Sequence, residues 1–345
     1  MNPSLVLAID GGNSKTDVAL VRADGELLGA TRGGGSSPHQ IGTDGCVELL
    51  DALLAEVLEQ AGLARDGRPI AEIAHVHLAG ADLPAEELEL ERAVASRGWA
   101  ARAIVANDTF AVLRAGTDAG WGVAIVCGAG INCVGVAPDG RHSRFPALCA
   151  ITGDWGGGYD VGMAGLWAAA RSADGRGSKT SLEQAVPRHL GLDTPNDVAE
   201  AIHLGRFATT RVVELAPLVF AAAEDGDDVA QSILARLAEE LVTLARVALQ
   251  RLDLTDEAVD VVLGGGLLRS DHGPLLAAVE EGIHAVAPAA TVRVTTAAPI
   301  VGAALLGLDE LGAGAAAQER LRRELAAALA GSAPTTVEGA VGANG

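Results

Sequence analysis

The chain has 345 residues and a formal net charge of −20 at pH 7; 49% of its residues are hydrophobic and only 3% are aromatic. This length accommodates two domains, and the composition predicts cores of small aliphatic side chains in helices packed on sheets. The excess of negative charge would repel the phosphate backbone of nucleic acid and the anionic surface of a membrane, so neither is an expected partner.

Targeting and redox signals are weak in this sequence. The start, MNPSLVL, lacks the basic n-region and long apolar core of a signal peptide, so a cytoplasmic protein is expected. The uncharged stretch 119–138 has the length of a membrane span, but the glycines of GAGIN interrupt it and two strands are predicted instead. Cys46, Cys127, Cys133 and Cys149 have no zinc-ligand spacing and are expected to be small buried hydrophobic residues.

The first third of the chain alternates apolar runs with glycine-rich turns and helical patterns. Strands are predicted at 5–9, 16–22, 26–32, 73–79 and 103–106. Helices are predicted from a Thr43 cap to about Ala61, after Pro84, and after the Asn107-Asp108 pair. The resulting order, β-β-β-α-β-α-β-α, indicates a mixed sheet covered by helices.

From Gly122 the opening pattern begins again. VAIVCGAGINCVGVAPDGR repeats the strand, glycine turn, strand and Asp-Gly hairpin of LVLAIDGGNSKTDVALVRADGE, which indicates an internal repeat. A helical insert is expected at 161–252, then a strand ending in three glycines, then a last strand and helix within 291–307. The predicted division is a domain at 1–116, a domain at 117–315, a C-terminal helix at 316–330 and a disordered tail at 331–345.

Two similar α/β halves, each opening with a glycine-rich hairpin turn, suggest a nucleotide bound in a cleft between them. Each turn would present backbone N–H groups to phosphate oxygens, because only glycine lets the main chain approach a phosphate closely. The first turn is Asp10-Gly11-Gly12-Asn13-Ser14-Lys15. Asp10 would hold Mg²⁺ through water, the amides after Gly11 would meet phosphate, and Lys15 would offset charge. An ordinary hairpin turn is the alternative.

Two further glycine runs follow strands. Gly128-Ala129-Gly130 occupies the turn of the second hairpin, and Gly264-Gly265-Gly266 follows the strand VDVVL. Three adjacent glycines would make room for a flat adenine, whereas a plain turn from strand to helix needs one. Each run is a weak signal alone, but their recurrence within a repeat is more specific.

Two aspartates are candidates for work on a substrate. Asp108 follows an apolar strand and opens a helix, which suits a catalytic carboxylate facing a crevice but also suits a helix N-cap. Asp154 lies among glycines, where it could bind a polyhydroxylated substrate while Trp155 stacks on a sugar face. The alternative for this pair is a turn with a core tryptophan.

Taken together, these segments resemble the BadF/BadG/BcrA/BcrD ATPase family of the actin/hexokinase/Hsp70 superfamily, and within it the N-acetylglucosamine kinases. The resemblance runs from about Leu5 to Gly307. Its pieces are AIDGGNSKTDVALV, SSPHQIG, HLAGAD, ANDTFAV, CGAGINCVGVAPDG, GDWGGGYDVG, AAEDGDDVA and VLGGGLLRS. It implies two duplicated actin-like ATPase domains of ribonuclease H-like fold, with a cleft between them.

The resemblance also implies roles for the candidate residues. Asp108 matches the catalytic aspartate and Asp10 the metal-binding residue. The implied sugar-binding residues are Ser37, His39, Asn107, Asp108, Asp154 and Trp155. The implied ATP-binding residues are Gly11, Gly12, Asn13, Ser14, Lys15, Gly128, Ala129, Gly130, Gly264, Gly265 and Gly266. Two positions depart from the family pattern: Pro38 stands where an asparagine is usual, and Trp155 replaces the glutamate of G-D-E-G.

The expected activity is therefore an ATP- and Mg²⁺-dependent kinase that phosphorylates an amino sugar, N-acetylglucosamine or glucosamine, at O6, or at O1 if the sugar binds reversed. The expected partners are ATP, the sugar and a second copy of the chain in a homodimer. The alternatives are an ATPase that activates an iron–sulfur dehydratase or reductase, for which Cys127 and Cys133 would be the candidate ligands, and an ATP-binding protein that has lost phosphoryl transfer.

Overall fold

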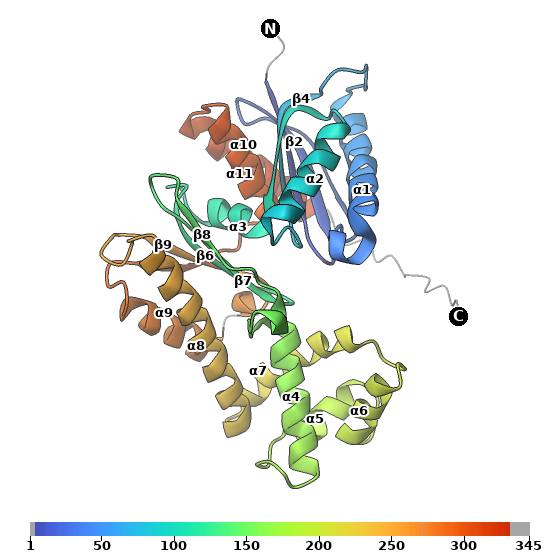
Figure 1. The fold of residues 1–345 in the computed structure, drawn as a ribbon, viewed down its shortest axis with the longest axis vertical. Helices are drawn as coiled ribbons and strands as arrows, with labels where there is room; N and C mark the ends of the chain where they lie inside the picture. Colours follow the sequence, from blue (N-terminus) through green and yellow to red (C-terminus); the bar gives the residue numbers. More distant parts are fainter. Residues whose placement is uncertain (1–3, 271, 332–345) are drawn as a thin grey trace. The chain divides into compact units, whose positions relative to one another are not determined.

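The computed structural model describes residues 4–270 and 272–331, which form two compact units (Figure 1). Among the described residues, unit 1 comprises residues 4–80, Leu88–Ala106 and 303–331, and unit 2 comprises Ala81–Glu87, 107–270 and 272–302. This grouping differs from the predicted division, because residues 107–116 group with unit 2 and residues from Ala303 on group with unit 1. Of the predicted tail, Gly331 ends the last helix, and residues 332–345 lie outside the described residues.

Unit 1 is built on a five-stranded sheet of order β3-β2-β1-β4-β5. Its strands are β1 (Leu5–Gly11), β2 (Thr16–Arg22), β3 (Leu27–Gly33), β4 (Ala71–Leu78) and β5 (Ala100–Asn107). β1 pairs with β2 antiparallel and with β4 parallel, so the sheet is mixed, as predicted. Its helices are α1 (Pro38–Ala61), α2 (Pro84–Ser96), α10 (Pro299–Glu310) and α11 (Ala315–Gly331).

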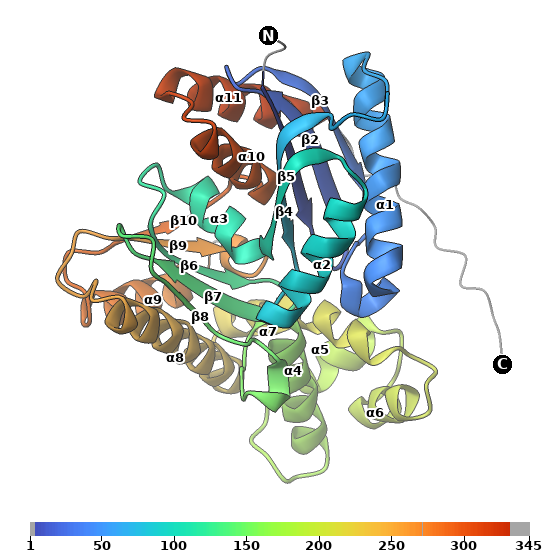
Figure 2. The same cartoon turned by 45° about the horizontal axis from the view of Figure 1, so that its top comes forward.

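Helices cover both faces of the unit 1 sheet. Successive side chains along a strand point to opposite faces, so the continuous apolar runs of its central strands need cover on both sides. Gly33 at the end of β3 lies so close to α1 that a Cβ there would come within 2.7 Å of Leu53. On the other face, a Cβ at Gly307 of α10 would come within 2.2 Å of Val6. Figure 2 shows α1 and α10 on opposite sides of the strands. Glycines at these contacts therefore let both helix layers approach the sheet closely.

Unit 2 repeats this topology, with strand order β10-β9-β6-β7-β8. The strands are β6 (Gly122–Cys127), β7 (Ile131–Val136), β8 (His142–Arg144), β9 (Asp260–Gly264) and β10 (Thr291–Val294). β6 pairs with β7 antiparallel and with β9 parallel, just as β1 pairs with β2 and β4. The internal repeat predicted from the two glycine hairpins is confirmed.

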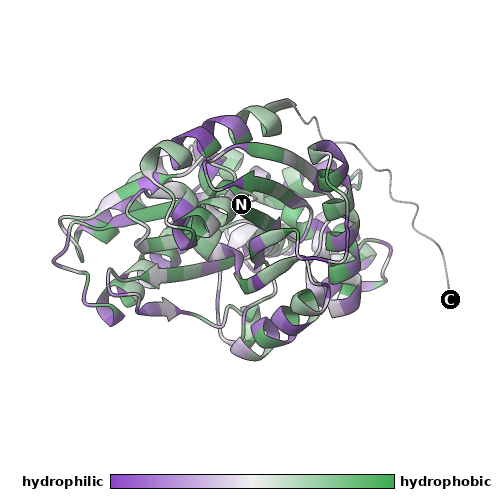
Figure 3. Cartoon of the chain, turned by 90° about the horizontal axis from the view of Figure 1, so that it is seen from above, coloured by the Kyte–Doolittle hydropathy of each residue, from purple (hydrophilic) through white to green (hydrophobic). Residues whose placement is uncertain are grey.

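Alternation along the unit 2 strands separates two cores. Ile125 and Leu263 belong to the large core formed with the helical insert, whereas Ala124 and Val262 pack with Val112 of α3 on the other face. Figure 3 shows the strands mainly in hydrophobic green, while the helices alternate between green and purple. The sheet is therefore buried on both faces, as expected for a sheet with parallel crossovers.

The helices of unit 2 are α3 (Asp108–Gly116), α4 (Gly157–Ala173), α5 (Leu182–His189), α6 (Pro195–His203), α7 (Ala216–Glu224), α8 (Asp228–Arg251) and α9 (Gly273–His284). Among them, α4 to α8 form the helical insert predicted at 161–252, while α3 precedes it and α9 follows it. Three 3₁₀ turns lie at Cys149–Ile151, Thr209–Leu215 and Leu268–Ser270. In α8, buried residues recur every three or four positions, and the Asp227 side chain accepts the N–H groups of Val229 and Ala230 at its start. Periodicity and cap together explain where this helix begins.

The uncharged stretch 119–138 forms β6 and β7, so the prediction of two strands there is confirmed. Over residues 4–270 and 272–331, none of the helices combines the length and the apolar character that crossing a membrane requires.

One local prediction was right only in part and another was wrong. A helical segment does begin directly after Gly42 (φ 74°), where α1 is kinked, but the Thr43 hydroxyl donates to Glu89 at 2.6 Å and does not cap it. Cys149 is exposed in a 3₁₀ turn, whereas the other three cysteines are buried as predicted. Thr43 follows a kink instead of capping the helix, and Cys149 lies in a turn instead of the core that its residue type favours.

His75 is a buried histidine whose ring nitrogens have no hydrogen-bond partner in the part of the chain that the structure describes. It lies on β4, 4% exposed, and stacks on His77 with ring centroids 5.7 Å apart. Burial, with a smaller contribution from the positive charge of Arg102, lowers the pKa of His75 from 6.5 to about 4. The folded protein therefore keeps this imidazole neutral.

A stability prediction follows from His75. The folded-state pKa is depressed, so the stability contributed by the neutral ring is fully present above pH 6.5 and is lost as pH falls towards 4. We expect the loss to reach about 3 kcal/mol. His75→Leu should flatten the fall in unfolding free energy over this range, measured by urea denaturation at several pH values, whereas His203→Gln at an exposed site should not. Equal slopes in the parent and His75→Leu would contradict the assignment.

Candidate functional site

Asp108 is the first residue of α3, directly after β5, but it does not cap that helix. The cap is Asn107, whose Oδ1 accepts the N–H of Thr109 at 3.0 Å and its hydroxyl at 2.6 Å. The backbone N–H groups of Asp108 and Thr109 lower the pKa of the Asp108 carboxyl, which favours its charged form. The capping alternative raised by the sequence therefore applies to Asn107, and the Asp108 carboxylate is left for another role.

The electrostatic environment of Asp108 favours proton uptake near neutral pH. Burial, followed by the negative charge of Asp82, raises the pKa of Asp108 from 3.8 to about 6, against the opposing effect of the two backbone N–H groups. A carboxylate of this kind is still ionised at pH 7 and is a stronger proton acceptor than a solvated aspartate.

Asn107 connects Asp108 to its surroundings. Its Nδ2 donates to Asp82 Oδ1 at 2.8 Å, and its Oδ1 also lies 3.4 Å from Asn132 Nδ2 on β7. Asn132 Oδ1 in turn accepts the N–H of Cys133 at 2.7 Å. The start of α3, which carries Asp108, is thus held to β7, the strand that follows the second glycine turn.

The second glycine turn, Gly128-Ala129-Gly130, is closed by a bond from Gly128 N to Gly130 O of 2.9 Å. Its carbonyl oxygens face the start of α4: Gly158 N donates to Gly128 O at 2.8 Å and Tyr159 N to Ala129 O at 2.9 Å. Among the described residues, the N–H of Ala129 has no protein acceptor. The turn therefore has the polarity that a phosphate-binding turn requires.

The start of α4 reaches the turn only because its first residues lack side chains. Gly157 has φ 73°, and a Cβ there would lie 2.5 Å from the backbone of Gly130. The motif GDWGGG is therefore needed for packing of α4 against the turn, in addition to any role of its aspartate.

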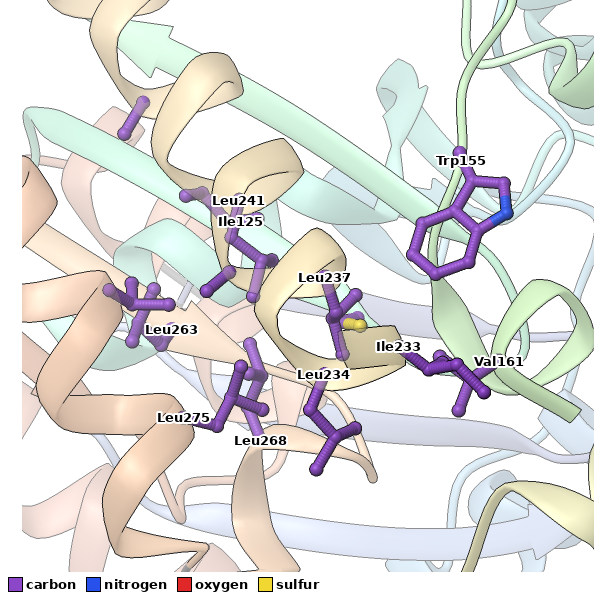
Figure 4. Close-up of a cluster of buried hydrophobic side chains, with 14 of the residues drawn as sticks. Ile125, Trp155, Val161, Ile233, Leu234, Leu237, Leu241, Leu263, Leu268 and Leu275 are labelled. Carbon is purple, nitrogen blue, oxygen red and sulfur yellow. The ribbon is translucent and has the colours of Figure 1, made fainter. Parts of the chain in front are cut away.

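Asp154 and Trp155 lie in different surroundings. The Thr152 hydroxyl donates to the half-buried Asp154 carboxylate, and Asp154 N donates to Cys149 O at 3.0 Å. Trp155 is 9% exposed and belongs to the large core (Figure 4), and the Arg236 guanidinium lies 4.0 Å from its ring centroid. These contacts favour the core alternative for Trp155 over stacking on a sugar.

In unit 1, the first glycine turn is compact and its tip is exposed. Gly12 N donates to Lys15 O at 2.8 Å, and Gly12 O accepts the N–H of Ser36 at 3.1 Å. A Cβ at Gly11 would come within 2.2 Å of Ser36 Oγ, so this glycine is required for the serine loop (residues 34–37) to pack on β1. Asn13, Ser14 and Lys15 are exposed.

Asp10 belongs to a row of charged side chains across the unit 1 sheet. In register, Arg32 lies opposite Asp17, Asp17 opposite Asp10, and Asp10 opposite His77. Arg32 donates to both carboxylate oxygens of Asp17, at 2.6 and 3.0 Å, while Lys15 Nζ lies 3.6 Å from Asp17. Arg32 therefore compensates the charge of Asp17, which is next to Asp10 on the same face.

The serine loop and the start of α1 bring two candidate sugar-binding residues into different environments. Ser37 is 2% exposed and packs against Gly80, where a Cβ would come within 3.2 Å of Ser37 Oγ. His39 is exposed on the first turn of α1. Pro38, which replaces the asparagine expected from the family pattern, occupies the first helical position, where its missing N–H costs no helical hydrogen bond.

The triple glycine has three distinct local roles. A Cβ at Gly264 would come within 2.7 Å of Val112. Gly265 has φ 97°, and a Cβ there would lie 2.3 Å from the Cys127 carbonyl oxygen. Gly266 is exposed and has nothing within 4 Å of its Cβ position. The first two glycines are explained by packing, and only Gly266 has room beside it for a ligand.

The residues that surround Asn107 had no recognisable signal in the sequence. Asp82 lies in the HLAGAD segment, which contributed to the family resemblance but received no role, and Glu87 and Arg144 gave no signal. Arg144 of β8 donates to both oxygens of Glu87 at 2.8 Å, and to the carbonyl oxygens of Ala81 at 3.0 Å and Asp82 at 3.2 Å. Partners so far apart in the chain can be found only in a structure.

Residues 7–307 match the family model described as "BadF/BadG/BcrA/BcrD ATPase family". The chain belongs to this family. The match covers most of the chain: apart from the first two residues of β1, both sheets lie within the shared region, and so does every candidate site residue named above.

Three similar proteins carry kinase names. N-acetylmuramic acid/N-acetylglucosamine kinase of Clostridium acetobutylicum is 29% identical over 267 residues, which are 77% of this chain and 86% of the relative. N-acetyl-D-glucosamine kinase of Dictyostelium discoideum is 27% identical over 317 residues, 90% of this chain and 99% of the relative. The crystal structure of a candidate N-acetylglucosamine kinase from Chromobacterium violaceum gives a TM-score of 0.70 at 26% identity, covering 88% of this chain and 99% of that one. The predicted duplicated actin-like fold is confirmed.

Proposed function

We propose that this family member is an ATP-dependent sugar kinase that transfers the γ-phosphoryl group to O6 of an N-acetylated amino sugar such as N-acetylglucosamine. The observation that carries the proposal is Asp108: a carboxylate at the start of α3, relieved of capping by Asn107 and with its pKa raised to about 6 by burial and Asp82. The kinase names of the similar proteins support the sugar class.

In the proposed reaction, Asp108 accepts the proton of the attacking sugar hydroxyl as its oxygen bonds to the γ-phosphorus of ATP. The bond between the γ-phosphorus and the β,γ-bridging oxygen breaks, ADP leaves, and the proton is later released from Asp108 to water. The N–H groups of the turn 128–130 are proposed to bind phosphate oxygens, and so, within unit 1, are those of residues 11–15. Asp154, held by Thr152, is proposed to accept hydrogen bonds from sugar hydroxyls.

Mg²⁺ is the metal that this chemistry requires, and Asp10 is the residue proposed to hold it, directly or through water. The donor set is suitable, because Asp10 is a carboxylate at the end of β1 whose neighbour Asp17 is already paired with Arg32. When bound, Mg²⁺ would neutralise charge on the phosphates. A homodimer and a location in the cytoplasm remain part of the proposal.

The alternative of an iron–sulfur activator receives no support from the cysteines. Cys127 and Cys133 lie on β6 and β7 at 0% and 1% exposure, and burial raises the pKa of both thiols, that of Cys127 to about 12. Cluster ligation needs thiolates that reach an iron site, and these two thiols are held in the core in their neutral form.

The function is tested by a coupled assay of ADP release with a panel of sugars: N-acetylglucosamine, N-acetylmuramic acid, glucosamine and glucose. We expect release that depends on an N-acetylated sugar and on Mg²⁺, with phosphate on O6 of the product by NMR. ADP release equal with and without every sugar would contradict the kinase proposal.

The adenosine assignment can be tested at Gly266 without disturbing the fold. Gly265→Leu would clash with the Cys127 backbone, so a raised KM for ATP in that variant would be ambiguous. Gly266 has open space, and Gly266→Leu should raise the KM for ATP about tenfold, roughly 1.4 kcal/mol, while changing the sugar KM little. Gly128→Ala, also in open space, provides a comparison at the phosphate turn. An unchanged ATP KM in folded Gly266→Leu would place the base elsewhere.

A further inference from the structure

Segment 81–87 brings a second carboxylate close to the start of α3. Asp82 Oδ1 accepts a hydrogen bond of 2.8 Å from Asn107 Nδ2, and Asn107 immediately precedes Asp108. Asn107 N also points to Glu87 Oε1 at 3.3 Å. Both contacts lie within unit 2, so the side chain and the backbone of the α3 cap are bound by the same short segment.

The segment itself is held by Arg144. One guanidinium nitrogen donates to both Glu87 carboxylate oxygens, and the other donates to two successive carbonyl oxygens, those of Ala81 and Asp82. The ion pair is well sheltered, with side-chain exposures of 18% for Arg144 and 19% for Glu87. A lysine could not make these four contacts, since the planar guanidinium supplies several donors in fixed directions.

At its other end, the segment is closed by Glu86. Its Oε2 accepts the N–H of Asp82 at 3.0 Å and that of Leu83 at 2.9 Å, as a carboxylate does at the start of a helix. Asp82 is thereby fixed through its N–H, its carbonyl and its carboxylate. A residue held at three points can maintain a defined distance to its neighbours.

We propose that Asp82 is a positioning residue for phosphoryl transfer, which anchors Asn107 and holds a second negative charge beside the Asp108 carboxylate. The inference rests on the proposed kinase function and assigns to it a residue that does not touch the reacting atoms. Arg144 and Glu87 serve it indirectly, by holding the segment that carries Asp82.

The charged groups on elements packed against α3 identify Asp82 as the one that acts on Asp108. Segment 81–87 contributes Asp82, Glu86 and Glu87, and β8 contributes Arg144 and His142, whose ring meets Phe110 of α3 edge-on at 6.0 Å. β9 contributes Asp260, which accepts the hydroxyl of Thr117 at the far end of α3. Of these six groups, only Asp82 shifts the pKa of Asp108, and it raises it. Arg144 is neutralised by Glu87, which explains why a guanidinium so close to Asp82 does not cancel its effect.

The test is the pH profile of kcat/KM for the sugar in Asp82→Asn. Asparagine keeps an acceptor oxygen for Asn107 but removes the charge, so the pKa of Asp108 falls and the acidic limb of the profile should move to lower pH by about 0.5 unit or more. A residue with only a structural role would lower the rate by one factor at every pH. Asp139→Asn, an exposed carboxylate paired with Arg141, is the matched control and should leave the profile unchanged.

Asp82→Ala provides a second variant, which removes both charge and acceptor. Its acidic limb should shift as in Asp82→Asn, and its kcat should fall at least about tenfold further because Asn107 loses its anchor. Acidic limbs within about 0.2 unit of the parent in both variants, or failure of both to fold as judged by circular dichroism, would overturn the inference. A parent protein without sugar-dependent ADP release would overturn the proposed function together with it, whereas an active parent with unshifted variants overturns this inference alone.

Discussion

Asp108→Asn should fold normally, bind ATP with near-parent affinity and turn over at least a hundredfold more slowly. The expected loss is within the factor of about 10²–10⁴ that a positioned proton acceptor usually contributes. Asparagine has nearly the same volume and keeps a side-chain oxygen near the backbone N–H groups of Asp108 and Thr109. What it cannot do at neutral pH is accept the proton of a sugar hydroxyl, so the loss should fall on kcat.

Effects on stability and on catalysis can be separated at Asp108, because Asn107 rather than Asp108 caps α3. A stability defect in Asp108→Asn is therefore not expected, and the melting temperature should stay within about 2 °C of the parent. Asn107→Ala is the matched comparison. Loss of the cap should lower the free energy of unfolding by about 1 kcal/mol, and the melting temperature should fall with it. Retention of more than a tenth of the parent kcat in Asp108→Asn would remove this residue from the chemistry.

Asp154→Ala should produce the second-largest effect, a rise of roughly thirtyfold in the sugar KM, or about 2 kcal/mol, from losing hydrogen bonds to a carboxylate. ATP affinity, measured by calorimetry without sugar, should be retained. The Thr152 hydroxyl donates to this carboxylate, so Thr152→Val should show a smaller effect in the same direction.

The control for Asp154 is Asp174→Ala, an exposed aspartate at the far end of α4 that pairs with Arg176. Its sugar KM should match the parent. Loss of ATP and sugar affinity together in Asp154→Ala would assign Asp154 to the structure of the loop that precedes α4 rather than to sugar binding.

The strand and helix pattern was predictable because its signals are local. Apolar runs broken by glycine, and the recurrence of one hairpin pattern from Gly122, predicted both sheets and their equal topology. The insert was predictable from helical periodicity, as in α8. The helical segment that begins after Gly42 (φ 74°) was predictable, but the capping role of Thr43 was not, because its hydroxyl donates to Glu89 instead.

Residues of the candidate site were predictable where a local motif indicates their role. The glycine turns and Asp108 followed from their position at strand ends, but the same sequence left two roles for Asp108, and the contact that separates them is made by its neighbour Asn107. Arg144 lies 63 positions from Ala81 and 57 from Glu87. No periodicity or spacing rule connects residues so distant in the chain. Their hydrogen bonds and ion pair form because β8 lies beside segment 81–87.

The bracing of the second glycine turn by α4 has a thermodynamic consequence. An isolated glycine-rich turn samples many conformations. A ligand that binds only one of them must order the turn, and the lost conformational entropy weakens binding. Here the carbonyl oxygens of Gly128 and Ala129 are already held by the first N–H groups of α4. Most of that ordering is accomplished when the chain folds, so the flexibility that glycine gives the unfolded chain is converted into a preformed arrangement of N–H groups before any anion arrives.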